Sequence, residues 1–108
     1  MSVIKIQSEY NDLDKYKFDI KHSTEIVFYT KKDTEIVHNP YGAAVINKYG
    51  YKEYWINNKL HRLDGPARIW PNGVEAYYIN DKQLSKEEFE YHPERLKFLN
   101  KEHLICLK

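Results

Sequence analysis

The stretches HNPYGAAVINKYGYKEYWINNK (residues 38–59) and HRLDGPARIWPNGVEAYYINDK (residues 61–82) align without a gap at an offset of 23 residues. Identical residues recur in register through the whole unit, from His38 and His61 at its start to Lys59 and Lys82 at its end. Self-similarity at a fixed period is the signature of a repeat architecture, in which neighbouring units bury a shared core. The sequence therefore predicts two tandem copies of one structural unit.

Each unit has the pattern of a β-hairpin. Its strands are expected at residues 43–47 and 51–56 in the first copy, and at residues 66–70 and 74–79 in the second. The connecting turns contain Gly50 and Gly73, which supply the positive φ angles that tight hairpin turns need. Two further pairs are expected to end the second strand of each unit, because Asn and Asp tolerate the left-handed region: Asn57-Asn58 and Asn80-Asp81.

Two-residue alternation divides the strand side chains between two faces of the sheet. The predicted core face carries Ala44, Ile46, Tyr54, Ile56, Ala67, Ile69, Tyr77 and Ile79. The opposite face carries Val45, Trp55, Arg68, Trp70 and Tyr78. A single-layer sheet buries little area, so one alternative is that flanking segments cover this second face. The other alternative is that the face binds a ligand.

The segments upstream of the repeats are expected to open the sheet. Residues 3–7, 16–20 and 25–30 have the composition of strands. Residues 25–30 resemble the second strand of a degenerate earlier unit, separated from His38 by an insertion. In that alignment Phe28 takes the place of Trp55 and Tyr78.

The segment after the repeats changes character. Ser85 and Glu88 form a capping-box pattern, and apolar residues then recur at helical spacing. Two short helices are expected, over residues 86–91 and 93–104. The predicted fold is thus one mainly β (α+β) domain over residues 1–108, an antiparallel sheet of tandem hairpins. N-terminal strands fill residues 1–34, the repeats residues 35–82, and a helical cap residues 83–108.

Composition narrows the function classes. The formal net charge of +1 makes the whole molecule no electrostatic trap for nucleic acid, and no apolar run approaches the length of a membrane span. The single cysteine, Cys106, and the absence of a signal-peptide pattern favour a reducing cytoplasm. The apolar setting of Cys106 raises a thiol pKa, and no Gly-rich phosphate loop or nucleophile motif is present. We therefore expect no enzyme and no cofactor.

Equivalent residues in successive hairpins are expected to lie two strands apart, about 10 Å. Two nitrogens on one zinc ion lie at most about 4 Å apart, so His38 and His61 are not expected to share a metal ion.

The segment from Tyr54 to Ala67, YWINNKLHRLDGPA, resembles a repeat of the form YWxNGKLHRxDGPA. That repeat occurs in uncharacterised phage, large-virus and some bacterial proteins and is similar to the MORN-type hairpin repeat. The resemblance covers residues 35–99 and implies stacked hairpins in a viral accessory protein. It carries over no catalytic residue. The first copy departs from the pattern, with Asn39 and Tyr41 where the second has Arg62 and Asp64.

The cluster His61, Arg62 and Asp64 has two interpretations. Arg62 would grip an anionic ligand, or Asp64 would cap the turn before Gly65 and pair with Arg62 to fix the loop.

The leading hypothesis is a non-enzymatic interaction protein, a phage or viral accessory protein that inhibits a host macromolecule such as a defence component. Trp, Tyr and Arg dominate protein interfaces, so the expected binding residues include Trp55, Arg68, Trp70 and Tyr78. The alternative is a nucleotide or nucleic-acid binder that stacks bases on the same aromatic and basic face. No membrane partner is expected, and open sheet edges leave a homodimer as an alternative to a monomer.

Overall fold

The computed structural model describes residues 18–106, with side chains up to residue 100. The elements are β1 (Phe18–His22), β2 (Ile26–Lys31), β3 (Val45–Asn47), β4 (Lys52–Glu53), β5 (Trp55–Ile56), β6 (Lys59–Leu60), β7 (Arg68–Ile69), β8 (Glu75–Ile79), β9 (Lys82–Leu84), α3 (Lys86–Glu90) and α4 (Pro93–Cys106). The expected strand at residues 3–7, the first part of the one at 16–20 and the side chain of Cys106 lie outside this description. No helix in the described part of the chain is long and apolar enough to cross a membrane.

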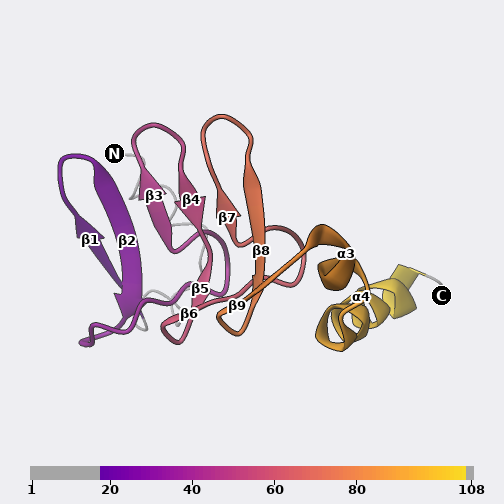
Figure 1. The fold of residues 1–108 in the computed structure, drawn as a ribbon. Coiled ribbons are helices and arrows are strands. Elements are labelled where there is room, and N and C mark those ends of the chain that lie inside the picture. Colours follow the sequence, from indigo (N-terminus) through magenta and orange to yellow (C-terminus); the bar gives the residue numbers. More distant parts are fainter. Residues whose placement is uncertain (1–17, 107–108) are drawn as a thin grey trace.

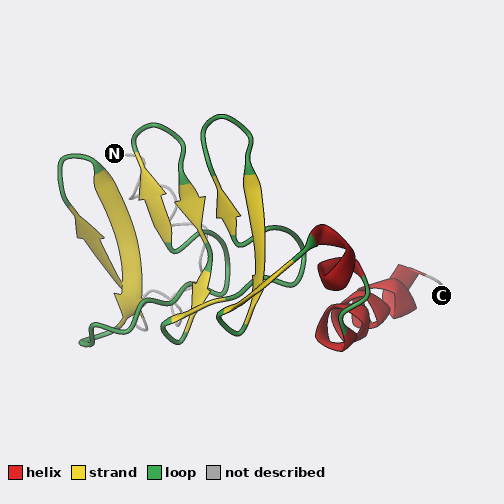
Figure 2. Ribbon diagram, viewed as in Figure 1, coloured by secondary structure: helices red, strands yellow, loops and turns green. Residues whose placement is uncertain are grey.

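Three hairpins stand side by side in one antiparallel sheet, in the order β1-β2-β3-β4-β7-β8-β9 (Figure 1). The short strands β5 and β6 form a separate two-stranded ladder below β4. Both helices lie beyond the sheet at its C-terminal end, as Figure 2 shows. The predicted mainly β fold with a helical C-terminal cap is therefore confirmed.

The two repeats adopt the same backbone. Gly50 and Gly73 both have positive φ, at 99° and 90°. The Nδ1 atom of His38 accepts a hydrogen bond from the Asn57 N–H at 3.0 Å, and that of His61 accepts one from the Asn80 N–H at the same distance. Corresponding residues of the two segments thus occupy corresponding backbone settings.

Asn57-Asn58 and Asn80-Asp81 end the second strand of each unit, and each pair forms a tight turn after which the chain continues as a further strand. Asn57, Asn58, Asn80 and Asp81 all have φ between 49° and 70°. Two consecutive residues at positive φ form the type I′ turn of a β-hairpin, so the chain returns through β6 or β9. The sequence pattern did not predict these return strands. The predicted second strand at 51–56 is accordingly divided at Tyr54, where it leaves the large sheet.

Each of these turns also joins its unit to the preceding one. The Asn58 side-chain oxygen accepts a hydrogen bond from the Val37 N–H at 2.7 Å. In the next unit, Asp81 accepts from the Leu60 N–H at 2.8 Å. Glycine would permit the same turn but would supply no such acceptor, which accounts for Asn and Asp at these two positions.

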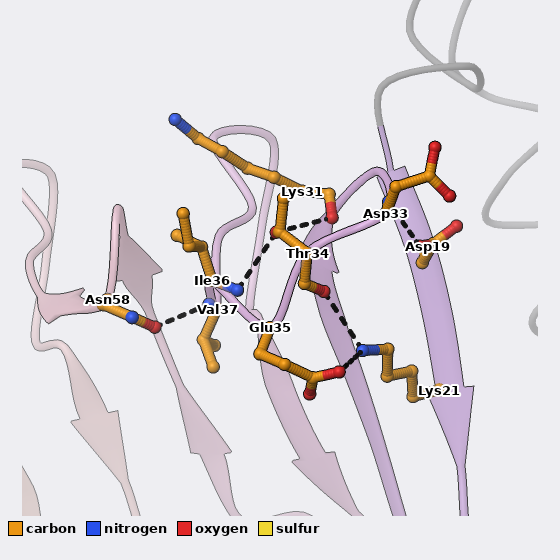
Figure 3. A network of polar contacts seen from close by, with 9 residues as sticks. All are labelled: Asp19, Lys21, Lys31, Asp33, Thr34, Glu35, Ile36, Val37 and Asn58. Carbon is orange, nitrogen blue, oxygen red and sulfur yellow. Dashed lines mark hydrogen bonds and ion pairs between the residues drawn. The ribbon is translucent and has the colours of Figure 1, made fainter.

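The N-terminal hairpin is an incomplete copy of the same unit with a longer lower turn. Figure 3 shows how that turn is held: Lys21 lies 3.2 Å from both the Thr34 carbonyl and the Glu35 carboxylate, and the Asp33 N–H donates to Asp19 at 2.8 Å. Thr30 and Val37 form a bridge across this turn, as Trp55 and Leu60 do across the shorter one. The turn between the paired residues is therefore two residues longer in the N-terminal hairpin than in the unit that starts at His38.

The predicted equivalence of Phe28 with Trp55 is wrong. The Tyr29 N–H donates to the Ala44 carbonyl at 2.9 Å, as the Tyr54 N–H donates to Ala67 at 2.8 Å. Tyr29 therefore matches Tyr54, and the fully buried Thr30 stands where the next unit has Trp55. Matching by aromatic character displaced the alignment by two residues.

The core is narrower than the alternation predicts. Ala44 and Ala67 are fully buried and Ile79 nearly so, but the other predicted core residues are half-buried: Ile46, Tyr54, Ile56, Ile69 and Tyr77. Tyr29 and Phe89 are the largest fully buried apolar side chains of the described residues.

The C-terminal cap forms as predicted. The Ser85 hydroxyl accepts from the Glu88 N–H at 3.0 Å, and the Glu88 carboxylate accepts from the Ser85 N–H at 2.8 Å. This capping box begins α3 and directs Phe89 onto Ile79 and Leu84. The Arg95 guanidinium lies 4.5 Å from the centre of the Phe89 ring and donates to the Leu63 carbonyl at 2.6 Å, tying α4 to the second repeat.

Candidate functional site

The predicted binding residues fall into two groups on different parts of the molecule. Arg68, Trp70 and Tyr78 lie close together on the large sheet, and Trp55 of the β5–β6 ladder joins them through Glu53; these four residues are here named the aromatic face. His61, Arg62 and Asp64 line a groove between the loops that connect successive units, here named the loop groove. All are half-buried except Asp64, which is exposed.

A single buried carboxylate organises the aromatic face. Glu53 is 9% exposed and accepts hydrogen bonds from the Trp55 indole at 2.8 Å and from the Tyr51 hydroxyl. The same carboxylate pairs with Arg68, whose Nη2 atom lies 3.1 Å away. Glu53 and Arg68 face each other across the β4–β7 ladder, so this ion pair also fastens the two repeats together.

Aromatic rings surround the Arg68 guanidinium. Its central carbon lies 5.9 Å from the Trp70 ring centre and 5.7 Å from the Tyr78 ring centre, within the range of cation–π attraction. The Tyr51 ring packs on Trp70 with 5.6 Å between centres. The aromatic face is therefore a preformed patch of rings around a charge-balanced pair.

The pKa of Tyr51 reflects this setting. Burial raises the pKa of its phenol to about 12, and the hydrogen bond to the Glu53 carboxylate acts in the same direction. The phenol thus stays protonated and keeps donating to Glu53 far above neutral pH.

Two residues of this cluster were not among the predicted binding residues: Glu53 and Tyr51. Their positions in the second repeat are held by Ala76 and Val74, so the repeat alignment did not mark them. The available signal was strand alternation, which places Tyr51, Glu53 and Trp55 on one face.

In the loop groove, Arg62 holds its own loop in place. It donates to Asp64 at 2.8 Å and to the Pro66 carbonyl at 3.1 Å, and its guanidinium carbon lies 3.9 Å from the centre of the Tyr54 ring. A Cβ atom placed on Gly65 would meet this guanidinium at 3.1 Å. Arg62 is thus held between the tyrosine ring and the backbone of its own loop, an arrangement that fits the structural interpretation of Arg62 and Asp64.

His61 also has a structural contact. Its Nδ1 atom accepts the Asn80 N–H, which fixes the neutral tautomer with the proton on Nε2. Burial lowers the pKa of His61, and burial likewise lowers the pKa of His38. Both imidazoles are therefore neutral at pH 7, where they hold the following hairpin turn.

The loop groove has a volume of about 420 Å³. Tyr54 and Ile56 lie beneath the loops of residues 39–42 and 61–64, and Phe98 of α4 lines the groove as well. Its size falls within the range of small-molecule sites. Its one arginine is already bound to Asp64 and Pro66, so the groove presents little net charge to an anionic ligand.

Metal-ligating residues do not cluster in the part of the chain that the structure describes, where no group of three or more His, Cys, Asp or Glu side chains is placed to hold a metal ion. His38 and His61 are each engaged with a different hairpin turn, at Asn57 and Asn80.

Comparison of the chain with protein-family models, with curated proteins and with solved structures finds no match.

Proposed function

We propose that this chain is a non-catalytic interaction module that binds a partner protein through its aromatic face. The observation that carries the proposal is a half-buried cluster in which Trp70 and Tyr78 lie against Arg68, and Trp55 donates to the Glu53 carboxylate that pairs with Arg68. These residue types supply most of the binding free energy at protein interfaces. Trp55 is held by its hydrogen bond to Glu53, and Trp70 and Tyr78 are held against Arg68, so binding would cost little side-chain entropy.

A protein partner fits this face better than a nucleic acid does. Phosphate recognition needs cations available to the ligand, and nonspecific affinity rests on them. The Arg68 guanidinium is already paired with Glu53 at 3.1 Å, so the centre of the face is close to neutral. Aromatic rings around a neutralised pair favour a partner surface of apolar and polar side chains.

The resemblance to phage and large-virus repeats extends the proposal to an accessory protein that inhibits a host macromolecule in the host cytoplasm. Residues 54–67 carry that resemblance. The single cysteine of the chain accords with a reducing compartment.

The test is affinity capture with the tagged chain as bait, quantified by mass spectrometry. Trp70→Ala removes a ring from the aromatic face, and Tyr49→Ala removes an exposed ring in a turn outside it. We expect a partner recovered by the wild type and by Tyr49→Ala, and lost at least tenfold with Trp70→Ala. Equal recovery with both variants would overturn the assignment of this face.

A nucleotide panel tests the alternative. Mono-, di- and cyclic nucleotides at millimolar concentration are expected to leave the melting temperature unchanged. A stabilisation that Arg68→Ala abolishes would instead favour a nucleotide-binding face.

A further inference from the structure

The large sheet has an open edge at β1. This strand pairs with β2 on one side, and no described element pairs with its other side (Figure 1). The strand at the opposite end of the sheet, β9, has three residues where β1 has five, and it leads directly into α3. Among the described strands, β1 therefore presents the longer edge to which a further strand can be added.

The hairpin turn after β1 shows which of its residues bond to β2. The Ser23 N–H donates to the Ile26 carbonyl at 2.8 Å, so these two residues form a hydrogen-bonded pair. Opposed residues of an antiparallel ladder alternate between hydrogen-bonded and non-hydrogen-bonded pairs. Counting back from Ser23, Lys21 and Asp19 bond to β2.

The other three residues of β1 direct their backbone groups to the open edge. Phe18, Ile20 and His22 occupy the non-hydrogen-bonded positions opposite β2. The neighbouring strand agrees with this assignment, because Tyr29, which lies opposite Ile20, donates its N–H to Ala44 on its other side at 2.9 Å. The N–H and carbonyl groups of these three residues of β1 thus point away from β2.

We propose that two copies of this chain form a dimer in which their β1 strands pair antiparallel about a two-fold axis at Ile20. In this pairing Ile20 exchanges both backbone hydrogen bonds with Ile20 of the second copy, and Phe18 exchanges both with His22. Every outward backbone group of β1 then has a partner, and one sheet runs through both chains. The same edge serves both copies, as a two-fold interface requires.

The charges of β1 select this register. With the axis at Ile20, Asp19 of each copy lies directly opposite Lys21 of the other copy, on the same face of the sheet. Opposite charges at such positions stabilise a strand pair, and the symmetry supplies the contact twice. An axis displaced by one residue sets Asp19 against Asp19 or Lys21 against Lys21, which destabilises the pair.

Both charged side chains are already held on that face. Figure 3 shows the Asp19 carboxylate accepting from the Asp33 N–H at 2.8 Å, and the Lys21 ammonium 3.2 Å from the Glu35 carboxylate. Asp19 and Lys21 are also half-buried. Pairing across the dimer therefore costs little additional side-chain entropy.

The dimer leaves the aromatic face uncovered. Arg68 and Tyr78 lie on β7 and β8, toward the opposite end of the sheet from β1. The dimer is therefore independent of the proposed function, and each of the two can fail without the other.

Sedimentation velocity of the full chain tests the dimer. We expect a reversible shift from monomer toward dimer between about 5 µM and 1 mM, because a strand pair of this length is a small interface. Proline is tolerated where a strand N–H faces outward, so Ile20→Pro should keep the far-UV circular dichroism spectrum and remain monomeric. Ile20→Val keeps the backbone N–H and should dimerise like the wild type. A wild type that stays monomeric over the whole range, or an Ile20→Pro variant that dimerises, would overturn the proposal.

Charge reversal tests the register without changing the backbone. Asp19→Lys and Lys21→Glu each set like charges opposite one another, so each variant alone should dimerise about tenfold more weakly or worse. An equimolar mixture of the two restores opposite charges at both positions and should form a heterodimer. Lys59→Glu makes the same change in net charge as Lys21→Glu at an exposed site in β6, and it should leave the dimer unchanged. If the two reversed variants do not pair with each other, or if Lys59→Glu weakens the dimer equally, the proposed pairing of β1 is wrong.

Discussion

Replacement of Glu53 by alanine should be among the most destabilising single changes on the aromatic face. The change removes the acceptor of three donors, from Arg68, Trp55 and Tyr51. A hydrogen bond to a charged partner contributes about 1.5–3 kcal/mol, and breaking a fully buried ion pair costs about 3–5 kcal/mol. The Arg68 side chain is 32% exposed and regains water, so the lower part of that range applies.

We expect Glu53→Ala to lower the free energy of unfolding by about 2–3 kcal/mol, which corresponds to about 10–20 °C in melting temperature for a domain of this size. Urea titration followed by far-UV circular dichroism gives the free energy directly. Glu53→Gln keeps one acceptor and should cost about 1 kcal/mol. Glu25→Ala is the control at an exposed glutamate and should change stability by less than about 0.5 kcal/mol.

A double-mutant cycle with Arg68→Ala isolates the pair, and we expect a coupling of about 1–2 kcal/mol. A change below about 0.5 kcal/mol for Glu53→Ala, in a cooperative transition, would refute the assignment of Glu53 as the organising residue.

Three further predictions concern titration and turns. The His61 pKa is lowered in the folded state, so its contribution to stability is complete above about pH 6.5 and is lost as the pH falls through the lowered value. The variant His61→Asn keeps an acceptor for the Asn80 N–H. In urea titrations it should lose less stability than the wild type between about pH 7 and 5. The Tyr51 pKa is raised to about 12, so stability should fall as the pH rises from about 10 to 12, and the phenolate absorbance that differs between wild type and Tyr51→Phe should titrate near pH 12. Asn57→Gly should leave thermal stability unchanged or raised. Asn58→Gly should lower it by about 1 kcal/mol, because the Val37 N–H loses its acceptor. Equal effects of the two changes would contradict the role of the Asn58 side chain in connecting the two units.

Most of the fold was predictable because the repeat places identical residues in identical settings. Gly50 with Gly73, and His38 with His61, matched in sequence and also in backbone and hydrogen bonds. The return strands β6 and β9 were missed because two or three residues show no periodicity. Their signal lay in the paired positive-φ residues, Asn57-Asn58 and Asn80-Asp81, which specify a hairpin turn.

The candidate sites were predictable in part. Alternation placed Trp55, Arg68, Trp70 and Tyr78 on one face, and the structure brings them together. The carboxylate at their centre was not recognised, because a glutamate within a strand is usually a solvent-facing residue. Its burial depends on Arg68 of the neighbouring unit, a tertiary contact that no local pattern encodes.

The side-chain hydrogen bonds of Asn58 and Asp81 each connect a unit to the unit directly before it and to no other. The stabilisation from one such hydrogen bond is therefore independent of how many units follow it. If a second copy of the 23-residue segment were inserted after Leu60, the units on both sides of it would offer the same hydrogen-bond partners that the segment has now. The length of the sheet is thus set by the point at which the chain turns into α3, and duplication offers a simple route to longer versions of this protein.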